Sequence, residues 1–283
     1  MLTIRDEYRA RLDANPALER FCEHAEALVR ADDPETFWDV QPFFQDLLTT
    51  NLVEAFVEHE LRAVAGTPLH FMGRSSELHT PLVETAAYAL TLRFRSPQAL
   101  VPQPVVSIAE HTLLAAWSGR VDVETFTLAP PFRNEVFDRS QRLVPTRSIA
   151  LVPGMVVRFE SPAEAFRLHL EQPAILLQLQ SATVASLRWM FDPDTLEPVR
   201  ASAARLSSSR LQFTCHALAA LGSPRSIPAL KRLTTHPEHY VRWAAVQSLC
   251  AISRDDGLEC LRRASEDDHP HVRRAAEQTL ARC

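Results

Sequence analysis

The stretch HPEHYVRWAAVQSL at residues 236–249 returns, with substitutions, as DDHPHVRRAAEQTL at residues 267–280. The two copies lie 31 residues apart, and the same spacing separates three leucines: Leu218, Leu249 and Leu280. Within each copy the apolar residues fall at helical spacing after a polar turn. A repeat of this length with two helices per unit is typical of an α-solenoid, in which each unit packs on its neighbours. The sequence therefore predicts stacked helix pairs over residues 202–283.

The repeat resembles a known family. Its polar turn, Val-Arg pair, Ala-Ala pair and closing leucine are similar to the HEAT-like repeats of phycobilin lyases. We expect the alanines to let helices pack closely and the arginine to tether neighbouring turns. The resemblance implies a scaffold that binds a protein partner, and it does not specify an activity.

The repeats are mildly basic within a chain of net charge −5. From Ala201 onward there are 12 Lys and Arg against 8 Asp and Glu, whereas the first 200 residues carry 18 against 27. We expect an acidic partner to meet the basic side chains of the repeats: Arg225, Lys231, Arg232, Arg262, Arg263, Arg273 and Arg274. Nucleic-acid binding is not expected, because it asks for a denser basic stripe and for more stacking aromatics than Tyr240 and Trp243.

Histidines gather in the turns of the repeats, namely His236, His239, His269 and His271. The run H-P-E-H resembles a metal-binding pair, but its counterpart D-H-P-H occupies the same turn one repeat later. Equivalent turns between helices explain both runs, and no cysteine pair completes a zinc site. We therefore interpret these histidines as structural.

Cysteine usage and the N-terminal residues indicate a cytoplasmic protein. Five cysteines, an odd number without a CxxC motif, favour reduced thiols: Cys22, Cys215, Cys250, Cys260 and Cys283. The first residues, MLTIRDEYRARLDA, are charged from the start and lack the apolar core of a signal peptide. No apolar run approaches the length of a membrane span, so no membrane association is expected.

Two further segments precede the repeats. Residues 1–66 are predicted to be helical, because Asn15-Pro16 and Asp33-Pro34 are helix-start signals and apolar residues follow at helical spacing. Residues 67–201 are predicted to form antiparallel strands, because β-branched residues alternate with polar ones between turn signals. Expected strands cover residues 88–95, 105–117, 120–128, 148–159, 165–170, 174–180 and 186–191.

The middle segment resembles a cupin, more loosely the cysteine-dioxygenase-like branch. TLLAAWSGRVDVETFTL (112–128) is similar to the first cupin motif, with Gly119 as its turn glycine. ALVPGMVVRFESPAEAFRLHLEQPAILLQLQ (150–180) is similar to the second, which opens with a Pro-Gly turn. The predicted fold class is therefore α+β: N-terminal helices plus a cupin-like antiparallel barrel or sandwich, followed by an α-solenoid.

The resemblance implies a metal site that this sequence does not supply in the usual places. Counting from Gly119 puts Val106 and Ile108 where the family has a His pair, and Thr112 where it has a glutamate. Counting from Gly154 puts Ala165 or Phe166 where it has a further histidine. Apolar side chains there would fill the cavity rather than bind a cation.

Two functions remain open from the sequence. The first is a non-catalytic binding or accessory protein, without a cofactor, whose barrel holds at most a small-molecule ligand and whose repeats dock a protein. The second is a metal-dependent cupin oxygenase that uses Fe(II) or another divalent metal on a small molecule or a carrier-bound substrate. Its non-standard ligands would be drawn from His79, His111, His169 and Glu84.

Overall fold

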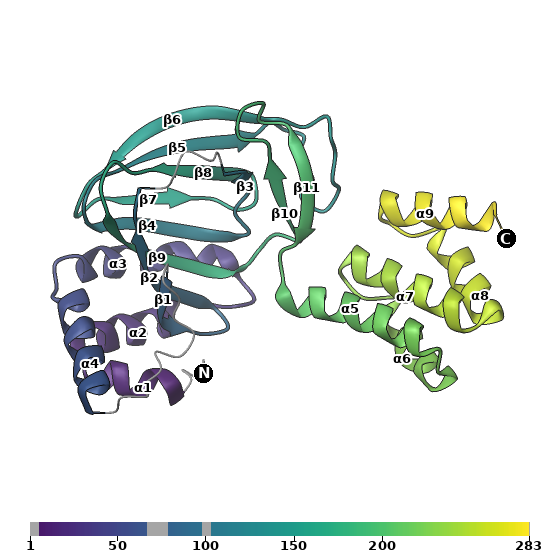
Figure 1. Cartoon of the computed structure of the whole chain (residues 1–283), viewed down its shortest axis with the longest axis horizontal. Helices are drawn as coiled ribbons and strands as arrows, with labels where there is room; N and C mark the ends of the chain where they lie inside the picture. Colours follow the sequence, from purple (N-terminus) through teal and green to yellow (C-terminus); the bar gives the residue numbers. More distant parts are fainter. Residues whose placement is uncertain (1–5, 67–78, 98–102, 283) are drawn as a thin grey trace. The chain divides into compact units, whose positions relative to one another are not determined.

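The computed structural model describes residues 6–66, 79–97 and 103–282 (Figure 1). Its internal contacts divide the chain into two compact units. The first, named the sheet unit, comprises Met1–Phe132, Arg139–Ala185 and Met190–Val199. The second, named the repeat unit, comprises Arg133–Asp138, Ser186–Trp189 and Arg200–Cys283. Among the described residues, no helix is both long and apolar enough to cross a membrane.

The described strands form sheets of five, three and three strands, with the orders β1–β2–β9–β4–β7, β6–β5–β8 and β11–β10–β3. Neighbours in the first two sheets run antiparallel. The strand bounds are β1 His79–Glu84, β2 Tyr88–Arg95, β3 Val105–Val106, β4 Glu110–Ser118, β5 Val121–Leu128, β6 Leu143–Leu151, β7 Val156–Phe159, β8 Glu164–His169, β9 Ala174–Thr183, β10 Leu187–Phe191 and β11 Pro198–Ala203.

The antiparallel sheets predicted for the middle of the chain are thus confirmed, and in the described residues they stay separate rather than closing into one barrel. The expected strand 105–117 is interrupted between β3 and β4. Strand β6 begins earlier than expected, because Pro145 is tolerated where the pairing with β5 shifts register on an edge strand. Strands β1 and β11 were not predicted.

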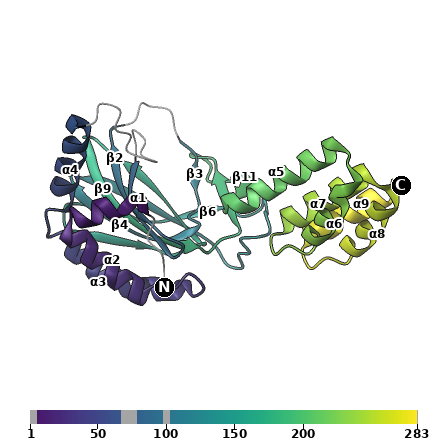
Figure 2. The same cartoon turned by 90° about the horizontal axis from the view of Figure 1, so that it is seen from below.

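Helices cover one face of the five-stranded sheet, as Figure 2 shows for α1 to α4. Their bounds are α1 Asp6–Asp13, α2 Pro16–Leu28, the 3₁₀ helix η1 Pro34–Val40, α3 Gln41–Leu47 and α4 Leu52–Gly66. Helix α2 begins as predicted, because the Asn15 side chain accepts the Leu18 N–H at 3.1 Å and Pro16 occupies the first turn. Apolar side chains of α2, η1, α3 and α4 share one core with Leu113 of β4 and Leu177 of β9.

The opposite face of this sheet packs on the β6–β5–β8 sheet. Because side chains alternate along a strand, Leu114 and Leu176 turn away from the helices. They share a second core with Val123 of β5 and Leu151 of β6. The sheet unit therefore has three layers, with helices, a five-stranded sheet and a three-stranded sheet.

The C-terminal helices form the predicted stack. Their bounds are α5 Leu206–Leu221, the 3₁₀ helix η2 Pro224–Ser226, α6 Ile227–Leu233, α7 His239–Ile252, α8 Arg254–Ala264 and α9 Pro270–Leu280. Helix α7 packs against α5, α6 and α8. Val241 and Val272, which are equivalent in the two repeats, are both buried. The 31-residue period therefore corresponds to one helix pair, α6–α7 and then α8–α9.

Candidate functional site

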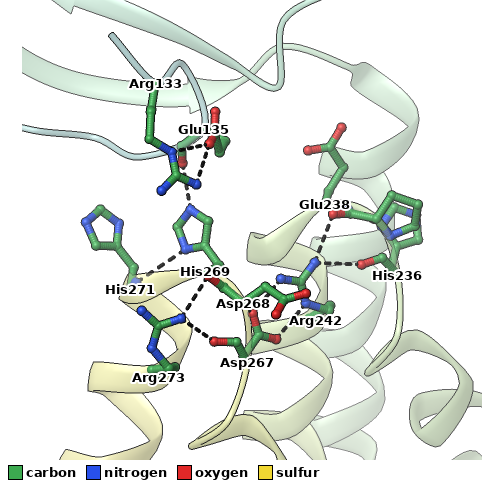
Figure 3. A network of polar contacts seen from close by, with 11 residues as sticks. Arg133, Glu135, His236, Glu238, Arg242, Asp267, Asp268, His269, His271 and Arg273 are labelled. Carbon is green, nitrogen blue, oxygen red and sulfur yellow. Dashed lines mark hydrogen bonds and ion pairs between the residues drawn. The ribbon is translucent and has the colours of Figure 1, made fainter. Parts of the chain in front are cut away.

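The turns between the helices of each pair hold a network of charged and polar side chains in the repeat unit (Figure 3). Arg242 donates to the carbonyl oxygens of His236 and Pro237, each at 2.9 Å. One repeat later, Arg273 donates to the carbonyl oxygens of Asp267 and Asp268, at 2.5 and 2.8 Å. The Val-Arg position of the repeat thus closes the turn that precedes its own helix.

Arg242 also reaches the turn of the next repeat. Its Nε and Nη2 donate to the two carboxylate oxygens of Asp267, at 2.8 and 2.6 Å. Burial raises the pKa of Asp267, but hydrogen bonds from Arg242 and from the His269 N–H outweigh it, so that pKa is lowered. The two side chains are only 15% and 12% exposed. The expected tether between neighbouring turns is confirmed.

Histidine and aspartate perform the same capping task at equivalent turn positions. Asp267 Oδ1 accepts the His269 N–H at 2.8 Å, and His236 Nδ1 accepts the Glu238 N–H at 3.1 Å. His269 caps α9 in turn, because its Nδ1 accepts the His271 N–H at 3.3 Å. In both histidines Nδ1 is therefore the acceptor nitrogen of the ring.

The rings of His239 and His269 stack in parallel, with centroids 3.7 Å apart and planes at 4°. Burial, together with the positive charge of neighbouring Arg242, lowers the pKa of His239 to about 3. Burial also lowers the pKa of His269, whose Nε2 lies 2.8 Å from the carbonyl oxygen of Glu135. Because Nδ1 of His269 is an acceptor, Nε2 carries the proton and donates to that carbonyl.

A segment distant in sequence completes this part of the repeat unit. Asn134 is buried, and its side chain donates to the Leu187 carbonyl and accepts the Ser186 and Leu187 N–H groups, each at 2.8 Å. Trp189 Nε1 donates to the Asn134 carbonyl at 2.9 Å. This anchors the loop that presents Glu135 to His269. In the described residues no group of three or more His, Cys, Asp or Glu side chains is placed to hold a metal ion.

The basic side chains expected to meet a partner fall into two groups. Three have partners within the chain: Lys231 lies 2.6 Å from Asp256, Arg263 pairs with Glu259, and Arg273 holds its turn. Four are exposed and make no ion pair with described residues: Arg225, Arg232, Arg262 and Arg274. The exposed four are therefore available to a partner.

In the sheet unit, apolar side chains occupy the places where the cupin resemblance expects metal ligands. Ile108 and Phe166 belong to the region where the two sheets pack, and Ile108 is 8% exposed. Ala165, the neighbour of Phe166 on β8, is fully buried. Thr112 is fully buried and donates to the Glu110 carbonyl at 3.1 Å. Ile108 and Phe166 pack between the sheets, and the side chains at these positions do not fit a divalent cation.

The four alternative ligand candidates are spread over three strands, β1, β4 and β8. His79 and Glu84 are at opposite ends of β1, and the Tyr8 hydroxyl donates to Glu84 at 3.4 Å. His169 ends β8 on the other sheet, where its Nε2 lies 3.3 Å from Glu124 Oε2. His111 lies on β4. The assignment of a metal to these residues stays a prediction.

His111 faces the helices rather than the space between the sheets. It is 2% exposed, and its ring lies against those of Phe37 and Trp38, with centroids at 6.4 and 4.9 Å. Its Nδ1 accepts the Ser161 N–H at 3.2 Å. Burial lowers the pKa of His111. This environment is that of a neutral core histidine.

Comparison with known proteins identifies the C-terminal segment. Residues 211–281 match the family of HEAT repeats, so this part of the chain consists of HEAT repeats, as the sequence predicted. No curated protein matches the chain.

Solved structures resemble parts of the chain at low identity. The hydroquinone 1,2-dioxygenase PnpCD is 21% identical, with 34% of this chain and 58% of that chain covered and a TM-score of 0.25. The hydroquinone 1,2-dioxygenase from Sphingomonas sp. TTNP3 is 16% identical, with 40% of this chain and 70% of that chain covered and a TM-score of 0.29. The 11S globulin of Wrightia tinctoria is 9% identical, with 42% of this chain and 23% of that chain covered and a TM-score of 0.27. The chain spans less than two thirds of the PnpCD chain, and no activity is transferred from these proteins.

Proposed function

We propose that this protein is a non-catalytic accessory protein whose HEAT repeats dock an acidic protein partner. The observation that carries the proposal is the set of four exposed arginines, Arg225, Arg232, Arg262 and Arg274, which have no partner among the described residues. Stacked helices present extended surfaces for protein binding. Exposed positive charge on such a surface favours an acidic partner and accelerates its association.

The sheet unit serves as a scaffold in this proposal, because apolar side chains fill the places where a cupin would hold its metal. A second part of the proposal is that a small-molecule ligand binds between the two sheets. Gln178 on β9 is 3% exposed, and its side-chain oxygen has no hydrogen-bond partner among the described residues. A buried amide oxygen of this kind offers an acceptor to a ligand.

We place the protein in the cytoplasm, where thiols stay reduced. Among the described residues, Cys22, Cys215 and Cys260 are free thiols. All three are buried, which suits packing rather than disulfide exchange.

The docking proposal is tested by charge reversal. The full-length chain and a variant with Arg225→Glu, Arg232→Glu, Arg262→Glu and Arg274→Glu would be used to enrich partners from the source cells by chemical crosslinking and quantitative mass spectrometry. The matched control carries four reversals at exposed arginines of the sheet unit: Arg9, Arg20, Arg139 and Arg147.

We expect an acidic protein that the wild type and the control enrich equally and that the repeat variant loses by at least tenfold. Its retention should also fall as salt rises, because exposed charges are screened. Equal enrichment by all three proteins, or the absence of any enriched protein, would contradict the proposal.

A further inference from the structure

Helix α5 carries apolar side chains on two opposite faces. One face includes Cys215, which is fully buried in the core of the repeat unit. The other face holds large apolar side chains that are exposed: Leu206 at 65%, Phe213 at 70% and Leu221 at 76%. With Arg210 and Ala217, they lie within an arc of about 80° around the helix. Apolar residues on both sides are typical of a helix that is covered on both sides.

The repeat register identifies this exposed face as a stacking face. Phe213 and Ala217 of α5 occupy the positions of Ala244 and Ser248 one repeat later. Ala244 and Ser248 are 1% and 0% exposed, and the Ser248 hydroxyl donates to the Cys215 carbonyl at 2.8 Å. In α7 these positions therefore receive the preceding helix. The same positions of α5 have no such helix among the described residues.

The other side of the stack has a different character. Cys215 and Val246, both buried, correspond to Glu277 in α9, which is exposed. Arg274 and Gln278 of α9 are exposed as well. A polar outer face is what a solenoid needs where it meets water. The apolar outer face of α5 departs from this rule.

Charge favours an acidic partner over a second copy of this chain. Residues 198–237 contain no Asp or Glu and six Lys and Arg: Arg200, Arg205, Arg210, Arg225, Lys231 and Arg232. Arg210 is exposed in the middle of the apolar face, without an ion-pair partner among the described residues. A second copy would bring another arginine to this face and no carboxylate. A protein that covers this face of α5 has to supply a carboxylate for Arg210.

The size of the face fits a single helix. Helix α5 has 16 residues, so it is about 24 Å long. One partner helix laid along α5 would continue the packing that α5 itself makes on α7.

We propose that the exposed face of α5 binds an amphipathic helix of the partner, apolar on its contact side and flanked by acidic residues. This inference rests on the proposed function, since it names the element that the docked protein presents. Phe213 and Leu221 form the apolar contact, and Arg210 pairs with a carboxylate of the bound helix.

The probe is a stapled 16-residue helix with leucines along one face and glutamates beside them. A second peptide differs only in having lysines for the glutamates. Binding to the full-length chain would be measured by fluorescence anisotropy for the wild type, Phe213→Glu, Arg210→Glu and a control. The control is Leu61→Glu, which alters an apolar side chain of α4 that is 64% exposed. All three substituted side chains are exposed, and circular dichroism would verify folding.

We expect the wild type and Leu61→Glu to bind the glutamate peptide at least tenfold more tightly than Phe213→Glu does. Arg210→Glu should reverse the preference in favour of the lysine peptide. Equal binding by the wild type and Phe213→Glu would overturn the inference. So would a wild-type dimer that Phe213→Glu dissociates in sedimentation, or binding of a 20-base-pair DNA duplex that depends on Phe213.

The two proposals fail in different ways. If Phe213→Glu changes neither peptide binding nor partner enrichment while the four-arginine variant loses the partner, the α5 inference fails and the docking proposal stands. If the peptide binds α5 but no cellular partner depends on the arginines, the docking proposal fails.

Discussion

Single side chains of the repeat unit act at two places at once. Arg242 closes its own turn through two carbonyl oxygens and holds the next turn through Asp267. A planar guanidinium with several donors in a fixed geometry can do this, whereas an ammonium group cannot match both oxygens of a carboxylate. One arginine per repeat is therefore enough to fix the spacing of neighbouring turns.

The stacked histidines should make the repeat unit sensitive to acid. In the folded protein the pKa of His239 is lowered from 6.5 to about 3. As pH falls, His239 is therefore protonated in the unfolded chain before it is protonated in the folded protein. The contribution of the neutral His239 ring to the stability of the folded protein is complete above pH 6.5 and is lost as pH falls toward 3. Arg242 adds positive charge near the His239 ring, and the Asp267 carboxylate offsets part of it. His269 and His271 are the other titratable groups that act on this ring.

We therefore expect the unfolding temperature to be lower at pH 5 than at pH 7.5. The difference between the two pH values should be smaller in His239→Gln than in the wild type. Calorimetry of the wild type and the variant at both pH values checks this. His216→Gln, at an exposed histidine of α5, is the control and should keep the wild-type pH dependence. The same loss in His239→Gln as in the wild type would show that this ring does not contribute.

At the scale of the elements, close approach between α7 and α8 depends on a residue without a side chain. A Cβ added at Gly257 would lie 2.6 Å from Cys250 Cα and 3.0 Å from its backbone nitrogen. Backbone atoms cannot yield as a flexible side chain does, so the helices would have to separate. Such overpacking outweighs the helix propensity gained in replacing glycine by alanine.

Gly257→Ala should accordingly lower the free energy of unfolding by about 1–3 kcal/mol. The matched control is Gly66→Ala in α4, where an added Cβ would meet no atom within 4 Å. Its effect should stay within about 0.5 kcal/mol. Urea unfolding followed by circular dichroism measures both, and an unchanged Gly257→Ala protein would refute the packing argument.

At the scale of the whole molecule, the two units make different contributions. The sheet unit packs apolar side chains between its sheets, whereas the repeat unit exposes arginines and the apolar face of α5. We therefore expect untagged protein, purified without chelator and incubated with Fe(II), to hold well under one metal ion per chain. Mass spectrometry of metals gives this ratio directly.

The outcome separates the two functions that the sequence left open. About one iron, manganese, nickel or zinc per chain, lost in His169→Ala, would favour a cupin enzyme with displaced ligands. His169→Ala is the informative variant because His169 is exposed, whereas His111→Ala would also open a cavity in the core.

Local patterns in the sequence were sufficient for much of the fold. The cap at Asn15, strand β2 and the helix pairs of the repeats depend on residues close together in the chain, and the structure confirms them. Strand β1 was missed because a proline and few alternating residues hide its pairing with β2. Strand β11 was missed because it directly precedes the repeats, where the sequence pattern changes.

The sequence alone determined that the C-terminal segment is a HEAT-type stack, because the repeat follows from spacing along the chain. That apolar residues stand where metal ligands are expected is what the cupin resemblance implies. Only the tertiary structure decided that His111 faces the helices, that Glu135 meets His269 across 134 residues, and that one face of α5 is left exposed. These depend on which surfaces meet in space. Periodicity shows that a face is apolar, but only packing decides whether another element covers it.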